Sequence, residues 1–208
     1  MRKILVLVLV AMLLVSAMLA MTSCGEDPAS YSKYVGIDVE NATTGETYGT
    51  IIIELYKTKA PATVYNFQKL VASGFYNGLT FHRVIESFMI QGGDPKGDGT
   101  GGSGTNISGE MSGNGFTQNN LKHTRGTVSM ARSSSGYNTA SSQFFIMTET
   151  NLNLDGEYAA FGRVIEGMDV VDAIAKVDTD LSEGTGGKPL EVIKMTQVYL
   201  IDNYTPAE

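Results

Sequence analysis

The chain has 208 residues, of which 42% are hydrophobic and 18% are charged, a composition that is typical of globular proteins and argues against intrinsic disorder. Its 24 glycines show no three-residue period, which excludes a collagen-like structure. The formal net charge of −7 argues against a broad basic surface for nucleic acid. No linker or internal repeat divides residues 34–203, so we expect one domain there.

Residues 1–23 have the pattern of a secretory signal peptide. Arg2 and Lys3 precede an apolar run from Ile4 to Met21, in which Ser16 is the only polar residue. A basic start, an apolar run and small residues at a cut point are the features of such a signal. The alternative is a permanent membrane-spanning helix, because about 18 apolar residues can just cross a bilayer. We predict export across the cytoplasmic membrane.

Cys24 is the only cysteine in the chain, so no internal disulfide can form. Its place after the apolar run resembles the lipobox of bacterial lipoproteins, in which the thiol receives a diacylglycerol and the leader is cut before it. Met21 stands where leucine is most common in that motif. The alternative is a free thiol that happens to lie near a cleavage site. We expect lipidation of Cys24, a tether over residues 24–33, and an extracytoplasmic protein anchored to the cell membrane.

The first predicted elements of the domain are a β-hairpin and a helix. Residues 34–40 alternate as a strand does, and residues 48–56 are rich in β-branched and aromatic residues. The two runs flank a turn-like stretch, which predicts a pair of strands in a hairpin. Pro61 then opens a helix, since its missing N–H is not needed in the first turn, and Gly74 ends it. The spacing i, i+3 and i+7 gives this helix one apolar face, formed by Val64, Phe67 and Val71.

The rest of the chain is predicted to be mostly short strands. Residues 80–91 form two strands broken near Glu86 and Ser87, and the alternation of a strand places Phe81, Arg83 and Ile85 on one face. The glycine-rich residues 92–115 are predicted to be a long loop. Helical spacing recurs over residues 167–176. Further strands are expected at residues 126–131, 143–148, 159–165 and 190–201. Many short strands with two helices favour a closed or nearly closed antiparallel barrel.

Several motifs for other functions are absent or incomplete. Residues 97–102 (GDGTGG) match the dinucleotide pattern G-x-G-x-x-G, but the residues after them do not predict the helix that this motif requires. His82 and His123 lack the spacing of metal ligands to one another, so we expect no metal and no other cofactor. Asp94 and Asp98 could act as paired carboxylates, but in a glycine-rich loop we predict solvated turn residues.

The most informative run is FHRVIESFMIQGGD, residues 81–94, which combines a guanidinium, large apolar side chains and an amide. Taken alone, these could be core aromatics and a surface arginine. The run closely resembles the signature of cyclophilin-type peptidyl-prolyl isomerases. Further stretches resemble the family in the same order: PATVYNF (61–67), GTGG (99–102), LKHTRGTVSMAR (121–132), SSQFFIMT (141–148) and LDGEYAAFGRVIEGMDVVD (154–172). The resemblance covers residues 34–202 and implies an eight-stranded antiparallel β-barrel capped by two α-helices.

The resemblance also implies residue roles. Arg83 matches the family's catalytic arginine. The substrate-binding positions match Phe88, Met89, Gln91, Ala131, Gln143, Phe145, Leu154 and Tyr158. Arg132 stands where many eukaryotic members have asparagine, and the role of the histidine that matches His82 is less clear. Asn153 and Tyr158 stand where tryptophan and histidine are common. The loss of the tryptophan indole implies weak or no cyclosporin binding.

The function implied by the resemblance is peptidyl-prolyl cis-trans isomerisation that assists the folding of exported proteins. Its partners would be proline-containing peptides, unfolded exported proteins and, through the lipid, a membrane; we expect no nucleic acid, and a monomer. Two alternatives remain, a proline-peptide binding module without significant catalysis and a lipid-anchored scaffold. The presence of Arg83 favours the enzyme, because a binding module would be expected to lose the arginine first.

Overall fold

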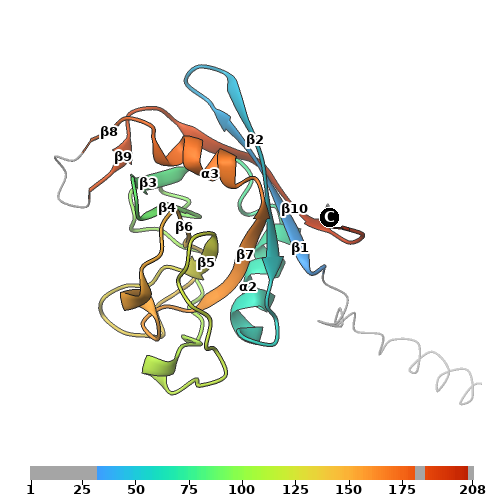
Figure 1. Ribbon diagram of the computed structural model, residues 1–208, viewed down its shortest axis with the longest axis vertical. Coiled ribbons are helices and arrows are strands. Elements are labelled where there is room, and N and C mark those ends of the chain that lie inside the picture. Colours follow the sequence, from blue (N-terminus) through green and yellow to red (C-terminus); the bar gives the residue numbers. More distant parts are fainter. Residues whose placement is uncertain (1–31, 181–185, 206–208) are drawn as a thin grey trace, which may run out of the picture. The chain divides into compact units, whose positions relative to one another are not determined.

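The computed structural model of the protein describes residues 32–180 and 186–205, so the leader, Cys24 and most of the predicted tether lie outside the described residues (Figure 1). Eight strands form one antiparallel sheet in the order β10-β1-β2-β7-β5-β6-β4-β3. Their bounds are β1 Tyr34–Asn41, β2 Glu46–Leu55, β3 Phe81–Ile85, β4 Met89–Gly92, β5 Thr127–Met130, β6 Phe144–Met147, β7 Ala160–Glu166 and β10 Ile193–Ile201. The predicted antiparallel architecture of eight strands is confirmed.

The sheet curls into a nearly closed barrel because its two edge strands meet. Thr80, just before β3, forms a bridge with Lys194 of β10. The backbone N–H of Met195 donates to the carbonyl of Leu79 at 2.8 Å, and the N–H of Gly78 donates to the carbonyl of Met195 at 2.8 Å. Closure removes the open edges that would otherwise invite pairing with other chains.

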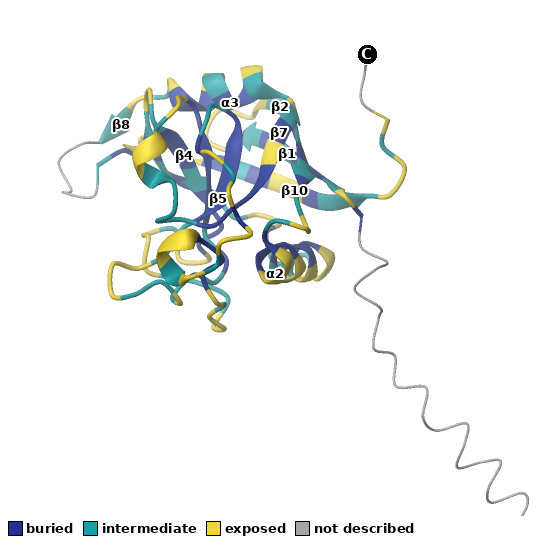
Figure 2. Cartoon of the chain, turned by 60° about the horizontal axis from the view of Figure 1, so that its bottom comes forward, coloured by how far each residue is buried: buried dark blue, intermediate teal, exposed yellow. Residues whose placement is uncertain are grey.

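Two helices lie at opposite ends of the barrel, α2 (Pro61–Ala72) and α3 (Met168–Ala175) (Figures 1 and 2). Pro61 opens α2 as predicted. The buried Glu110 carboxylate accepts hydrogen bonds from two N–H groups of the first turn, those of Ala62 (3.0 Å) and Thr63 (2.8 Å). Such groups lack partners within the helix, and a carboxylate there is favoured by the helix dipole. No helix within the described residues is long and apolar enough to span a membrane.

The main core fills the barrel between its strands and the helices. In Figure 2 the strands are largely buried, which reflects inward-facing side chains at alternate positions. Phe67 of α2 lies among aromatic rings of the sheet, 5.4 Å from Phe144 and 5.0 Å from Phe161 between ring centroids. A second, separate apolar cluster lies around Met89, Phe145 and Met147.

The long stretch between β4 and β5 is loop, as predicted, apart from the single turn η2 (Ser112–Asn114) and a bridge that pairs Ile107 with Ala140. The prediction that Asp94 is a solvated turn residue is wrong. Asp94 is 1% exposed, and its carboxylate accepts hydrogen bonds from the N–H groups of Lys96 (2.8 Å) and Gly99 (2.6 Å). This aspartate therefore organises the glycine loop from within, whereas Asp98 is exposed.

Candidate active site

The hairpin of β3 and β4 sets two pairs of side chains side by side on the outer face of the barrel. Arg83 lies opposite Gln91, and Ile85 lies opposite Met89. Directly opposed residues point to the same face of a sheet. Val84 and Ile90 lie between these two pairs and point the other way, into the main core.

Strand β6 extends both pairs into rows across three strands. Gln91 lies opposite Phe145, and Met89 lies opposite Met147. One row therefore runs from Arg83 through Gln91 to Phe145, and the other consists of Ile85, Met89 and Met147. The register places a cation, an amide and an aromatic ring next to a strip of apolar side chains.

The prediction that Phe81, Arg83 and Ile85 share a face is right for Arg83 and Ile85 and wrong for Phe81. The register of β3 shifts between Phe81 and Arg83, so His82 is an extra residue in the ladder. Such a bulge re-aims the side chains on either side of it. Phe81 consequently points into the main core, where it is 1% exposed, while Arg83 stays on the outer face.

The second apolar cluster forms a pocket beside Arg83, which we call the apolar pocket. Phe145 is central to it and 5% exposed, and its ring meets that of Tyr158 edge-on at 5.6 Å and 87°. Ser87 has φ 57°, the one positive value among described non-glycine residues, and this turn brings Phe88 into the cluster. The full cluster comprises Met89, Phe145 and Met147 with Ile85, Phe88, Ala131, Leu154 and Tyr158 packed against them.

Polar side chains form a hydrogen-bonded chain along the edge of this pocket. The Arg83 Nη1 donates to Gln91 Oε1 at 3.2 Å, and Gln91 Nε2 donates to Gln143 Oε1 at 2.8 Å. The Arg83 Nε donates to the carbonyl of Gly186 at 3.3 Å. Burial lowers the pKa of the Arg83 guanidinium, and nearby Tyr158 opposes this shift. Arginine nevertheless stays protonated in proteins, so Arg83 presents a fixed positive charge at the pocket.

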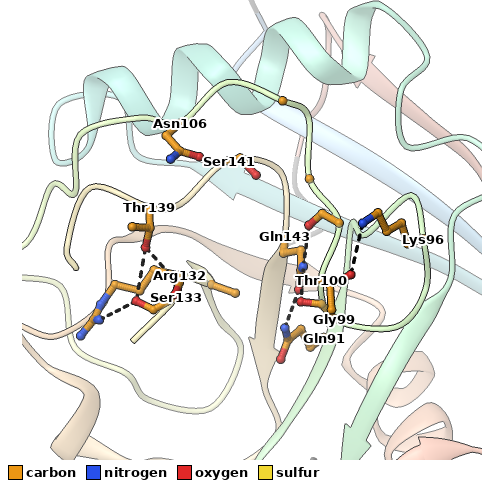
Figure 3. A pocket seen from close by; sticks show the side chains of 14 residues that line it. Gln91, Lys96, Gly99, Thr100, Asn106, Arg132, Ser133, Thr139, Ser141 and Gln143 are labelled. Carbon is orange, nitrogen blue, oxygen red and sulfur yellow. Dashed lines mark hydrogen bonds between the residues drawn. The ribbon is translucent and has the colours of Figure 1, made fainter. Parts of the chain in front are cut away.

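A polar cavity of about 420 Å³ adjoins the apolar pocket (Figure 3). Gln143 stands between the two and donates through Nε2 to the carbonyls of Gly99 (3.0 Å) and Gly101 (2.8 Å) in the glycine loop. Arg132 lies on the side of the cavity away from Gln91 (Figure 3). The glycine loop is thereby tied to the same glutamine that continues the chain from Arg83.

Comparison with known proteins shows which family the chain belongs to. The family model described as cyclophilin type peptidyl-prolyl cis-trans isomerase/CLD matches residues 38–200. The chain belongs to this family. It is therefore a peptidyl-prolyl cis-trans isomerase, as the sequence resemblance implied.

Individual relatives agree with this assignment. The chain is 43% identical over 164 residues to peptidyl-prolyl cis-trans isomerase CYP18-1 of Arabidopsis thaliana, a match that covers 78% of this chain and 97% of the relative. It is 46% identical over 128 residues to peptidyl-prolyl cis-trans isomerase B of Bacillus subtilis. This match covers 62% of this chain and 85% of the relative. Some other relatives are much longer, and the match covers 24% of their length.

A solved structure matches the fold. The crystal structure of a cyclophilin-type isomerase from Cryptosporidium parvum, determined in the presence of the dipeptide Ala-Pro, has a TM-score of 0.69 and 33% sequence identity. The match covers 82% of this chain and 99% of that one. The nearly closed barrel with two helices is thus the cyclophilin fold.

Behind the apolar pocket of this cyclophilin lies a buried polar network that the sequence alone did not predict. The His123 ring lies 3.0 Å from Ser129 Oγ through Nε2 and 3.0 Å from Asp155 Oδ1 through Nδ1. This is the set of residue types found in serine hydrolases, but Ser129 and His123 are both 0% exposed, so no substrate can reach the hydroxyl. Instead, the His123 ring stacks on Phe145 at 6.1 Å and 19°. The network therefore supports the floor of the pocket.

Both histidines are held in surroundings that disfavour their charged forms. Burial lowers the pKa of His123, although Asp155 partly offsets the effect. Burial also lowers the pKa of His82, which lies at the bulge beside Arg83 and whose ring nitrogens make no well-formed hydrogen bond. Each folded-state pKa therefore lies below the ordinary value of about 6.5.

We predict that the free energy of unfolding falls as the pH drops below about 6.5. In that window the unfolded chain protonates both histidines while the folded chain does not, so protons favour unfolding. Each histidine contributes a slope of at most about 1.4 kcal/mol per pH unit. Denaturant unfolding at pH 7.5, 6.5 and 5.5 measures it.

The matched controls are His82→Gln and His123→Gln, each of which should show a shallower dependence over the same range. Asp155 and Asp172 also have lowered pKa values. For Asp155, burial raises the pKa, but hydrogen bonds from His123 and Lys122 outweigh it. For Asp172, the hydrogen bond from Arg125 lowers the pKa. The stability that these two carboxylates contribute is present above about pH 3.9 and is lost only as the pH falls further. A wild-type stability that is flat from pH 7.5 to 5.5 would contradict the prediction.

The structure brings the predicted site residues together around one surface. Arg83 and the glutamines Gln91 and Gln143 form the polar edge, and the other predicted substrate-binding residues line the apolar pocket. Sequence reasoning missed Ile85 and Met147 as pocket residues. Strand alternation could have found both, since Met147 follows Phe145 by two residues. Within the described residues no group of three or more metal-ligating side chains is placed to hold a metal ion.

Proposed function

We propose that the apolar pocket holds the proline ring of the substrate while Arg83 donates a hydrogen bond to the proline nitrogen in the transition state. The observation that supports this most is the row that places the Arg83 guanidinium next to Gln91 and Phe145. The pocket is apolar and Arg83 lies at its edge with its charge fixed. The Cryptosporidium relative was crystallised in the presence of Ala-Pro, a dipeptide with the X–Pro bond that this pocket is proposed to hold.

Isomerisation of an X–Pro bond requires only an apolar pocket for the proline ring and a hydrogen-bond donor to the proline nitrogen. An X–Pro bond has a rotation barrier of about 18–20 kcal/mol because its C–N bond has partial double-bond character. In the twisted transition state this conjugation is lost, and the proline nitrogen keeps its lone pair and can accept a hydrogen bond. No covalent bond forms or breaks. A pocket that removes water from the amide also favours the twisted form, since the planar, more dipolar ground state loses more solvation.

Gln91 and Gln143 are proposed to bind the substrate backbone next to the proline. Their orientation is fixed, because Gln91 accepts from Arg83 and donates to Gln143, which in turn donates to the glycine loop. A preorganised amide can position an extended peptide so that only the bond before proline rotates. This arrangement supports the enzyme over a module that only binds peptides.

An isomerisation assay tests the proposed function directly. The purified protein should accelerate the cis-to-trans conversion of a short peptide with one X–Pro bond, and the refolding of a secreted protein limited by proline isomerisation. A protein that binds proline peptides and leaves both rates unchanged would instead be the binding module.

We further propose that the protein acts on exported proteins from a lipid anchor on Cys24. The support is the sequence of residues 1–24, with its basic start, apolar run and single cysteine. Uncatalysed X–Pro isomerisation takes tens to hundreds of seconds, which would delay the folding of secreted chains.

Mass spectrometry of the protein from a lipoprotein-processing bacterium tests the anchor. The prediction is an amino terminus at Cys24 that carries a diacylglycerol and partitions with membranes. The control Cys24→Ser should lose both the lipid and the membrane association. An unmodified thiol with the leader still attached would contradict the proposal.

A further inference from the structure

Arg132 contacts several other residues next to the apolar pocket. It follows Ala131 just after β5, and its side chain is 12% exposed. Its Nε donates to the carbonyl of Glu157 at 2.8 Å, its Nη1 donates to the carbonyl of Ser133 at 3.2 Å, and its Nη2 lies 3.1 Å from Glu157 Oε2. All three guanidinium nitrogens are thus used in binding other parts of this chain.

The same guanidinium lies against two tyrosine rings. Its central carbon is 4.7 Å from the ring centroid of Tyr137 and 4.9 Å from that of Tyr158. An arginine over an aromatic face gains cation–π attraction, which is stronger when the pair is shielded from water. The Tyr137 hydroxyl also donates to the Glu157 carboxylate, at 3.3 and 3.4 Å to its two oxygens. Arg132 therefore joins the segment around Tyr137 to the segment that carries Tyr158.

Tyr158 is the link from this cluster to the substrate. One ring contact of Tyr158 is with Arg132, and the other is the edge-on contact with Phe145 in the floor of the apolar pocket. A side chain that packs on both Arg132 and Phe145 has little freedom to change rotamer. If Arg132 is removed, the Tyr158 ring loses its cation–π contact and keeps the edge-on contact with Phe145.

We infer that Arg132 is a positioning residue, which fixes Tyr158 as a wall of the apolar pocket without touching the substrate itself. The inference rests on the proposed place of proline in that pocket. Arg132 lies away from Gln91 across the polar cavity (Figure 3), so it is not part of the polar edge formed with Arg83. Its effect should therefore be on the grip on the proline ring and not on the twisted amide.

The ion pair with Glu157 is the weaker part of this contact set. The Glu157 side chain is 47% exposed, and exposed ion pairs contribute little in water. The stacking on Tyr158 and the bond to the Glu157 carbonyl do not depend on that carboxylate. Glu157→Gln should consequently leave KM within about twofold of wild type. Arg132→Lys should raise KM as Arg132→Ala does, because lysine lacks the planar fork of the guanidinium.

Steady-state kinetics on a peptide with one X–Pro bond test the inference. Arg132→Ala should raise KM at least fivefold and leave kcat within twofold, the pattern expected when binding common to ground state and transition state is lost. The matched control is Arg125→Ala. Arg125 also forms an ion pair, with Asp172 of α3 through bonds of 2.7 and 2.6 Å, and its loss should change neither constant.

A double-mutant cycle with Tyr158 separates positioning from a general structural effect. The variant Arg132→Ala/Tyr158→Ala should have the KM of Tyr158→Ala alone, because the arginine acts through the ring. A KM ratio equal to the product of the two single ratios would overturn the inference. Circular dichroism and thermal unfolding of each variant show whether it folds, so that a rise in KM in a folded variant can be assigned to the pocket.

The outcomes also distinguish this inference from the proposed function. If Tyr158→Ala raises KM and Arg132→Ala does not, the positioning role is wrong and the proline site stands. If Tyr158→Ala and Phe145→Ala both leave KM unchanged, proline does not bind in the apolar pocket, and the inference fails together with the proposed site.

Discussion

Replacing Arg83 by alanine is expected to lower kcat/KM by at least tenfold while the fold stays intact. A hydrogen bond from a charged donor is worth about 1.5–3 kcal/mol, which corresponds to roughly 10- to 150-fold in rate. The loss should appear mainly in kcat, because the bond to the proline nitrogen is made only in the transition state. Isomerisation kinetics, with circular dichroism as a check on the fold, measure it.

Arg83→Lys is the conservative variant and should also be poor. Lysine keeps the charge but cannot hold the Gln91 amide and reach the proline nitrogen with one planar group. Arg163→Ala is the control, since Arg163 is an exposed arginine on β7, outside the site residues described above. Near wild-type kcat/KM for Arg83→Ala would reject the proposed role of the guanidinium.

Replacing Phe145 by alanine is expected to lower kcat/KM by at least tenfold and to destabilise the fold. Its ring is 5% exposed and packs on both Tyr158 and His123, so its removal opens the floor of the pocket. The loss of about 50 Å² of apolar contact with a proline ring corresponds to about tenfold in binding. Loss of a buried phenylalanine side chain costs about 3–5 kcal/mol in stability.

Phe145→Leu separates the two effects, because leucine retains apolar contact in the floor. It should lose less stability than the alanine variant and still show reduced kcat/KM. The matched control is Phe67→Leu, a fully buried phenylalanine of α2 in the main core. That variant should lose stability and keep kcat/KM per folded molecule. Equal kcat/KM for the two leucine variants would contradict a substrate-binding role for Phe145.

Much of the fold could be predicted because its signals are local. The spacing of Val64, Phe67 and Val71 predicted α2, with Pro61 as its first residue, and the β-branched runs predicted the first two strands. The closure of the barrel through Leu79 and Met195 is a contact between distant segments, and no local pattern of residues encodes it. The many short strands favoured a closed or nearly closed barrel without showing where it closes, and the family resemblance implied eight strands.

The sequence predicted which residues form the site better than it predicted how their side chains are arranged. Strict alternation along β3 predicted that Phe81 and Arg83 share a face. That prediction was wrong for Phe81, because the extra residue at the His82 bulge reverses the face of the strand. Asp94 was expected to be solvated from its glycine-rich surroundings, yet it is buried by the loop that it binds. The support of Phe145 by His123 depends on segments far apart in sequence, so residue spacing gave no sign of it.

A crystal structure of the protein with a peptide that contains Ala-Pro would show whether the proline ring and the Arg83 guanidinium meet at the apolar pocket. We expect the proline ring among Phe88, Met89 and Phe145, with the Arg83 guanidinium facing the amide nitrogen of that proline. A proline ring in the polar cavity beside the glycine loop, or an Arg83 side chain turned away from the bound amide, would contradict it.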